Sequence, residues 1–109
     1  MSIIVRNKIR QRYIGFKIKS NNKTPIKSFI QKEIQRQCKS ILNKESKEMG
    51  IKIIRINGNI GIIKCNHVEK NNVIMLLKSI NKIGSQDVNI NTIATSGTIR
   101  SLINKIIHL

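Results

Sequence analysis

Aromatic residues are scarce in this chain. Of its 109 residues only Tyr13, Phe16 and Phe29 are aromatic, and tryptophan is absent. Proteins that hold unpaired nucleic-acid bases usually stack them on aromatic side chains. The shortage argues against a surface that recognises several bases by stacking. We expect Phe16 and Phe29 in the apolar core, which leaves Tyr13 as the one aromatic side chain available to a base. A half-buried strand position for Tyr13 is a slightly better interpretation.

Acidic residues are also few. Five acids stand against 21 lysines and arginines, and the net charge is +16. Because the acids are interspersed with lysines, we expect surface ion pairs rather than a catalytic acid–base pair. The sequence has no metal-binding carboxylate cluster and no glycine-rich phosphate loop, so we expect no active site in this chain alone. The five acids are Glu33, Glu45, Glu48, Glu69 and Asp87.

Cysteine and histidine contribute two residues each: Cys38, Cys65, His67 and His108. Their spacing does not match a structural zinc site. Two unpatterned cysteines indicate buried free thiols in a reducing compartment. No apolar run approaches the length of a membrane span, and the first residues lack the apolar stretch of a signal peptide. We therefore expect a soluble intracellular protein with no membrane partner.

What the chain has in excess is positive charge. A compact body at +16 repels itself unless a polyanion neutralises it, and the usual partners are nucleic acid, anionic membrane or acidic protein. The basic residues are spread along the whole chain, which favours a folded basic body over a disordered basic arm.

The first half of the chain predicts a strand and a long helix. Alternating apolar residues predict a strand over residues 12–20. Thr24 as N-cap and Pro25 at the first helical position then indicate a helix start. Apolar residues recur at steps of three and four from there, which predicts a helix of about five turns or more, with Gly50 as its stop.

The second half predicts a hairpin, a helix, a strand and a final helix. Two β-branched runs, residues 51–56 and 60–65, flank an Asn-Gly turn, which is a good hairpin signal. A helical stripe follows over residues 73–83 and ends at Gly84. Alternation over residues 88–93 predicts a strand, and residues 99–106 form a third helical stripe.

The order β-α-β-β-α-β with a C-terminal helix is typical of one fold class. It predicts a single α+β domain over residues 1–109, with a ferredoxin-like or RNA-recognition-motif-like four-stranded antiparallel sheet and two helices on one face. The third strand of an RNA-recognition motif carries base-stacking aromatics, and here that strand has none. Binding is therefore expected to rest on phosphates rather than on base sequence.

Candidate phosphate contacts lie near the first strand and in the hairpin. Arg6, Lys8, Arg10 and Arg12 alternate, so they share a face if the segment is extended. Lys64 lies near the end of the hairpin. Any one of these charges, taken alone, is more often solvated than bound.

The segment from Thr95 to Arg100 is the sharpest local feature. Thr95, Ser96 or Thr98 can cap the last helix, and Gly97 allows the backbone to approach a ligand. Free amides at a helix N-terminus bind anions, and Arg100 lies one turn in. Two interpretations are equally supported: a phosphate site, or plain helix capping beside an exposed arginine.

Three motifs together resemble a known family. The motifs are RYIGFKI at residues 12–18, GIIKC at residues 61–65 and SGTIR at residues 96–100. In this order and spacing they resemble the small protein subunit of archaeal and eukaryotic ribonuclease P, which also serves ribonuclease MRP in eukaryotes. The compact length looks more like the archaeal form. The chain departs from the family in the short stretch before its second strand, where only Met49-Gly50 remains.

The resemblance implies a role as a non-catalytic subunit. In this family the catalytic RNA and its magnesium ions remove the 5′ leader of precursor tRNA, and the protein holds no cofactor. The resemblance implies two partners, the RNA and a barrel-shaped protein subunit, with precursor tRNA met indirectly. Two such heterodimers can join through this subunit. It also implies a cytoplasmic location in an archaeon, or a nuclear and nucleolar one in a eukaryote.

On that basis the RNA-binding candidates are Arg10, Arg12, Tyr13, Lys64, Ser96, Gly97, Thr98 and Arg100. Two other classes stay open. A ribosome-associated or other structured-RNA-binding protein of the same fold shares the charge and layout. A basic protein–protein adaptor predicts no salt-sensitive RNA binding. The apolar end of the chain, around Ile106 and Ile107, suits either a protein interface or a helix packed on the sheet.

Overall fold

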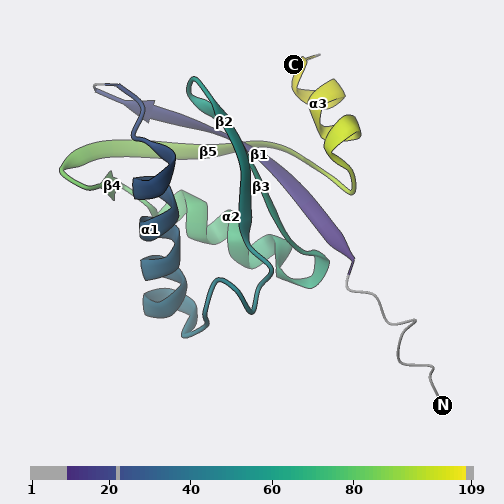
Figure 1. The fold of residues 1–109 in the computed structure, drawn as a ribbon, viewed down its shortest axis with the longest axis horizontal. Coiled ribbons are helices and arrows are strands. Elements are labelled where there is room, and N and C mark those ends of the chain that lie inside the picture. Colours follow the sequence, from purple (N-terminus) through teal and green to yellow (C-terminus); the bar gives the residue numbers. More distant parts are fainter. Residues whose placement is uncertain (1–9, 22, 108–109) are drawn as a thin grey trace.

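The architecture is an antiparallel sheet with helices on both faces (Figure 1). The structure, a computed structural model, describes residues 10–21 and 23–107. None of the described helices is long and apolar enough to span a membrane. The strands are β1 Gln11–Ser20, β2 Lys52–Asn57, β3 Ile60–Asn66, β4 Lys82–Ile83 and β5 Gln86–Ser96. The helices are α1 Lys27–Gln37, α2 Lys70–Ser79 and α3 Ile99–Ile107, with a π-helical turn at Cys38–Leu42 and a 3₁₀ turn at His67–Glu69.

The sheet confirms the predicted layout and adds a strand to it. Its order is β2-β3-β1-β5-β4, and every neighbouring pair is antiparallel. Without β4 this is the ferredoxin-like order, but within residues 10–21 and 23–107 the sheet has five strands and not the four expected. The extra strand pairs Lys82 with Asp87 and Ile83 with Gln86 around a turn at Gly84, which has a φ of 64°. Helix α2 therefore ends at Ser79, and Ile83, predicted to be helical, belongs to a hairpin.

The bounds of the first helix also differ from prediction. It begins at Lys27, and the extended Ile26 is its N-cap without a side-chain bond. Thr24 precedes a proline, whose ring disfavours helical backbone in the residue before it. The helix leads into the π-helical turn and ends at Asn43, in left-handed conformation with a φ of 53°. Gly50, the predicted stop, lies in the turns that lead into β2.

Helices α1 and α2 cover one face of the sheet and enclose the main core. The even-numbered residues Ile14, Phe16 and Ile18 of β1 are buried there, with Ile30 and Ile34 of α1. The prediction for Phe16 is confirmed. The prediction for Phe29 is wrong: its side chain is 51% exposed, as the inward face of α1 is set by Ile30 and Ile34. Both predicted thiols are free and buried: Cys38 and Cys65.

Helix α3 packs on the opposite face of the sheet, apart from the other two helices (Figure 1). A Cβ added to Gly15 would lie 2.8 Å from Cδ1 of Ile106 and 3.6 Å from Cδ1 of Leu102. The missing side chain at Gly15 thus lets α3 approach the centre of β1. Leu102 is fully buried in this contact, whereas Ile107 is 68% exposed. Ile106 supports the interpretation as a helix packed on the sheet, and Ile107 remains on the surface.

Candidate nucleic-acid interface

One row of residues crosses four strands beside α3. Strand register places Lys52 opposite Lys64, Lys64 opposite Tyr13, and Tyr13 opposite Ser96. Tyr13 shares the face of Gly15, so the row lies on the α3 side of the sheet, because strand side chains alternate between faces. We call these four residues the basic row. Three of its members were predicted from sequence; Lys52 was missed.

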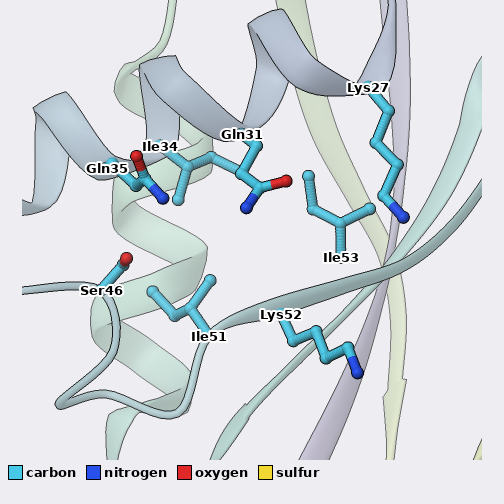
Figure 2. Close-up of a pocket in the computed structure, with 8 residues that line it drawn as sticks. All are labelled: Lys27, Gln31, Ile34, Gln35, Ser46, Ile51, Lys52 and Ile53. Carbon is cyan, nitrogen blue, oxygen red and sulfur yellow. The ribbon is translucent and has the colours of Figure 1, made fainter.

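Lys52 joins the row because β2 contains a bulge. The register shifts between Ile53 and Arg55, so Ile54 has no partner on β3. In Figure 2, Ile53 points toward α1 and Lys52 points away from it. Without the bulge, continuous pairing from the hairpin turn would place Lys52 opposite Cys65, on the core side. The bulge therefore turns a lysine onto the face that carries Lys64.

Electrostatically, the basic row is not neutralised. Like charges directly opposite each other in a sheet repel. In the described chain neither Lys52 nor Lys64 forms an ion pair. Lys52 is exposed, and Lys64 is partly exposed. An anion bound between the two ammonium groups would relieve this repulsion.

The row ends at the turn that begins α3. Thr98 caps the helix: its Oγ1 accepts a bond from the N–H of Ser101 at 3.1 Å, and its carbonyl accepts one from Leu102 at 3.1 Å. Ser96 is buried, and its Oγ accepts a longer bond, 3.4 Å, from the N–H of Thr98. The capping interpretation is thus confirmed. Because the first amides of a helix lack intrahelical acceptors, those of Ile99 and Arg100 stay available to an anion.

Arg12 lies opposite Cys65, so alternation places it on the other face of the sheet from the basic row, but its guanidinium reaches the same turn. Its Nη1 lies 3.8 Å from the place that a Cβ on Gly97 would occupy. Its Nε is buried, and this atom has no hydrogen-bond partner among the described residues. An arginine has five N–H donors, so a guanidinium held here retains capacity for an oxyanion. The structure therefore brings together two predicted features that are far apart in sequence.

The remaining predicted contacts lie around this end of the sheet. Arg10 is exposed just before β1, and its carbonyl accepts a 2.7 Å bond from the N–H of His67. Arg100 is exposed in the first turn of α3. Arg6 and Lys8, predicted to alternate with Arg10, lie outside the described residues, as does His108.

The described acids are engaged elsewhere, chiefly in ion pairs. Glu33 binds Arg36 at 2.7 Å and Glu45 binds Lys39 at 3.1 Å, as expected for surface pairs. Glu69 differs from expectation because it is buried; it accepts bonds from Lys44 at 2.8 Å and Asn72 at 2.9 Å. The bond from Lys44 holds the pKa of Glu69 below its ordinary value. The described residues contain no group of His, Cys, Asp and Glu that could hold a metal ion.

Comparison with known proteins decides the family. The model of the Rpp14/Pop5 family matches residues 12–107. The chain belongs to the Rpp14/Pop5 family. This confirms the resemblance found in the sequence and supports a protein subunit of ribonuclease P or MRP.

A solved structure has the same fold. It is a chain of the "Cryo-EM structure of yeast Ribonuclease MRP", similar at a TM-score of 0.63 and 11% sequence identity. The match covers 94% of this chain and 92% of that one. At this identity the likeness shows the fold alone. Comparison with curated protein sequences gives no match.

Proposed function

We propose that this Rpp14/Pop5 family member is a non-catalytic subunit of ribonuclease P that binds and supports the catalytic RNA during removal of the 5′ leader from precursor tRNA. The observation that carries the proposal is the basic row, in which Lys52 and Lys64 stand opposite each other and neither pairs with a carboxylate of the described residues. An RNA backbone supplies the anion that this arrangement lacks.

The role proposed for the row is electrostatic. Within the row, Lys52 and Lys64 would each contact a phosphate. Beside the row, Arg12 would contact another phosphate, and the amides after the Ser96-Gly97-Thr98 turn would bind a further phosphate oxygen together with Arg100. Arg10 extends the same surface. Tyr13, between Lys64 and Ser96 in the row, would stack on a base or donate its hydroxyl. A protein at +16 placed here reduces repulsion where RNA strands pack closely.

The chemistry would belong to the RNA. Magnesium ions would be held by the RNA, and this chain would supply no nucleophile. The precursor tRNA would be met through the RNA rather than directly. The protein partners we propose are a barrel-shaped subunit of the same enzyme and, through joined heterodimers, a second copy of this chain.

Sequencing the RNA bound by the full-length protein tests the proposal. The tagged chain is purified at moderate salt from its own cells, and the RNA is extracted. We expect enrichment of a ribonuclease P or MRP RNA over total RNA. Enrichment of ribosomal RNA would instead support a ribosome-associated protein, and absence of any salt-sensitive RNA would support a protein adaptor.

A further inference from the structure

The sheet has two edges. One is formed by the two-residue β4, which pairs with Gln86 and Asp87, and beyond it by β5. The other edge is β2, which has six residues, no proline and three isoleucines. Within residues 10–21 and 23–107 no strand pairs with the outer side of β2. Its outer N–H and C=O groups can therefore accept an added strand.

Two hollows run along this edge, between β2 and the first helix. The first, of about 140 Å³, lies between Gln31 and Ile34 of α1 and Ile51 and Ile53 (Figure 2). The second is more open, about 580 Å³, and lies between residues 24–27 and residues 54–58. Lys27 lines both, so they adjoin. We call the combined hollow, between residues 24–35 and 51–58, the β2 groove.

The β2 groove presents apolar side chains that the core does not use. The bulge leaves Ile54 without a cross-strand partner, and this partly exposed residue lines the groove. Ile26 lines the same part and is 61% exposed. Exposed aliphatic side chains beside a free strand edge are typical of a surface that another polypeptide covers.

The charge of the groove is of one sign. Lys27, Lys52 and Arg55 are its charged lining residues, although the Lys52 side chain points away from α1 (Figure 2). The lining residues in the described part of the chain include no carboxylate. In the described chain none of the three forms an ion pair. This charge favours an anionic occupant. The lining has no aromatic residue on which a base could stack, and it has aliphatic side chains that a sugar–phosphate backbone would leave unmatched. This combination favours an acidic polypeptide over RNA.

We propose that the β2 groove receives an extended segment of a protein partner, which pairs with the outer edge of β2 as an added strand. Aliphatic side chains of that segment pack on Ile26 and Ile54, and its carboxylates face Lys27 and Arg55. Only the expectation that this partner belongs to the ribonuclease P or MRP ribonucleoprotein rests on the proposed function. The groove and its chemistry are independent of it.

Site-directed photocross-linking in the assembled complex tests this. The full-length chain carries p-benzoylphenylalanine at position 54, or at position 82 on the other edge as a control. The ribonucleoprotein is purified through a tag and irradiated, and the adduct is identified by mass spectrometry. We expect position 54, and not position 82, to capture one polypeptide segment with Asp or Glu within a few residues of the adduct.

A charge reversal makes the result specific. Lys27→Glu with Arg55→Glu should lower the adduct about tenfold or more, as expected when charge pairs at a desolvated interface are broken. Lys47→Glu with Lys78→Glu changes the same number of exposed charges outside the groove and should leave the adduct unchanged. Circular dichroism confirms that both double variants are folded.

Several outcomes would overturn the proposal: an adduct with RNA, an adduct with a second copy of this chain, equal capture from positions 54 and 82, no adduct at position 54, or equal effects of the two charge reversals. The proposed function fails separately. If the purified complex holds ribosomal RNA while position 54 still captures an acidic segment, the groove assignment stands and the ribonuclease P assignment falls.

Discussion

Lys52 and Lys64 stand directly opposite each other on β2 and β3, on the face of the sheet that carries α3. Two lysines in this position oppose folding slightly and favour binding of a polyanion. Their juxtaposition depends on a single extra residue, Ile54, which shifts the register of β2 by one position. The bulge therefore serves both surfaces proposed above. It places Lys52 in the basic row, and it places Ile54 at the lining of the β2 groove.

The lysine pair predicts opposite effects on folding and on RNA binding. Lys52→Gln should raise the free energy of unfolding slightly, by about 0.2–1 kcal/mol, because it removes repulsion from Lys64. The same change should weaken RNA binding and lower the slope of log affinity against log salt by about 0.7–0.9, the value for one phosphate contact. Urea unfolding and filter binding at several salt concentrations measure the two effects. Lys78→Gln, an exposed lysine on α2, is the control and should move neither. If Lys52→Gln lowered the free energy of unfolding by as much as it weakened the free energy of RNA binding, the result would contradict this account.

Two glycines of the sheet should tolerate alanine to different degrees. A Cβ at Gly61 would contact the ring of the fully buried Phe16 and lie 2.8 Å from Cδ1 of Ile56. A Cβ at Gly15 would press mainly on the far end of Ile106, which can rotate. Gly61→Ala should therefore lower the free energy of unfolding by about 1–3 kcal/mol, as overpacked core positions do, and Gly15→Ala by less. Chemical denaturation of both variants checks the order, and the reverse order would show that α3 is packed more rigidly than Phe16.

The cap of α3 predicts that Thr98→Ala loses more stability than Thr98→Ser. Thr98→Ala removes the acceptor for the N–H of Ser101 and should cost about 0.5–2 kcal/mol of stability. Thr98→Ser keeps a hydroxyl in the same place and should restore most of it. Hydrogen exchange of α3 amides is the direct measurement, since fraying of the helix exposes them first. Equal protection in the two variants would mean that packing on Gly15 alone holds α3.

The partly buried ion pair of Lys44 and Glu69 predicts a pH dependence. The pKa of Glu69 in the folded protein is lowered below 4.5, chiefly by the bond from Lys44. The stabilisation that this carboxylate contributes is therefore fully present above its unfolded pKa and is lost as the pH falls through the folded value. Wild type should lose more stability than Glu69→Gln between about pH 5 and pH 3. Thermal melts across that range, with Glu45→Gln as an exposed control, measure the difference. Parallel curves for wild type and Glu69→Gln would show that the pair does not contribute.

Sequence patterns predicted the strand–helix order and most residues of the candidate interface, because alternation and helical periodicity are local properties. The core position of Phe16 and a cap of α3 among Thr95, Ser96 and Thr98 follow from such patterns. The failures involve residues whose environment is set by distant contacts. Ile83 fits the apolar stripe of α2, but the turn at Gly84 places it in β4, where it pairs with Gln86 of β5. Phe29 fits the stripe of α1 by spacing, yet it falls outside the face that meets the sheet.

Lys52 is the most informative omission. Its own strand carries no signal that distinguishes it from other lysines in a lysine-rich chain. A hairpin counted from the Asn-Gly turn, without a bulge, places it opposite Cys65 and hence on the core side. Only the position of the bulge reveals that it faces the RNA-binding candidates, and a bulge depends on packing across β2, β3 and α1 rather than on local composition.

The central claim is that the basic row supports a catalytic RNA. Leader removal from precursor tRNA by a reconstituted enzyme tests it most directly. The mixture contains ribonuclease P RNA, the barrel-shaped subunit and moderate magnesium, and cleavage is compared in the presence and absence of this chain. We predict that cleavage requires the chain and that Lys52→Gln with Lys64→Gln lowers the rate at a fixed protein concentration. The matched variant, Lys47→Gln with Lys78→Gln, should cleave like wild type. Cleavage that is indifferent to the chain, or equally sensitive to both double variants, would contradict the account.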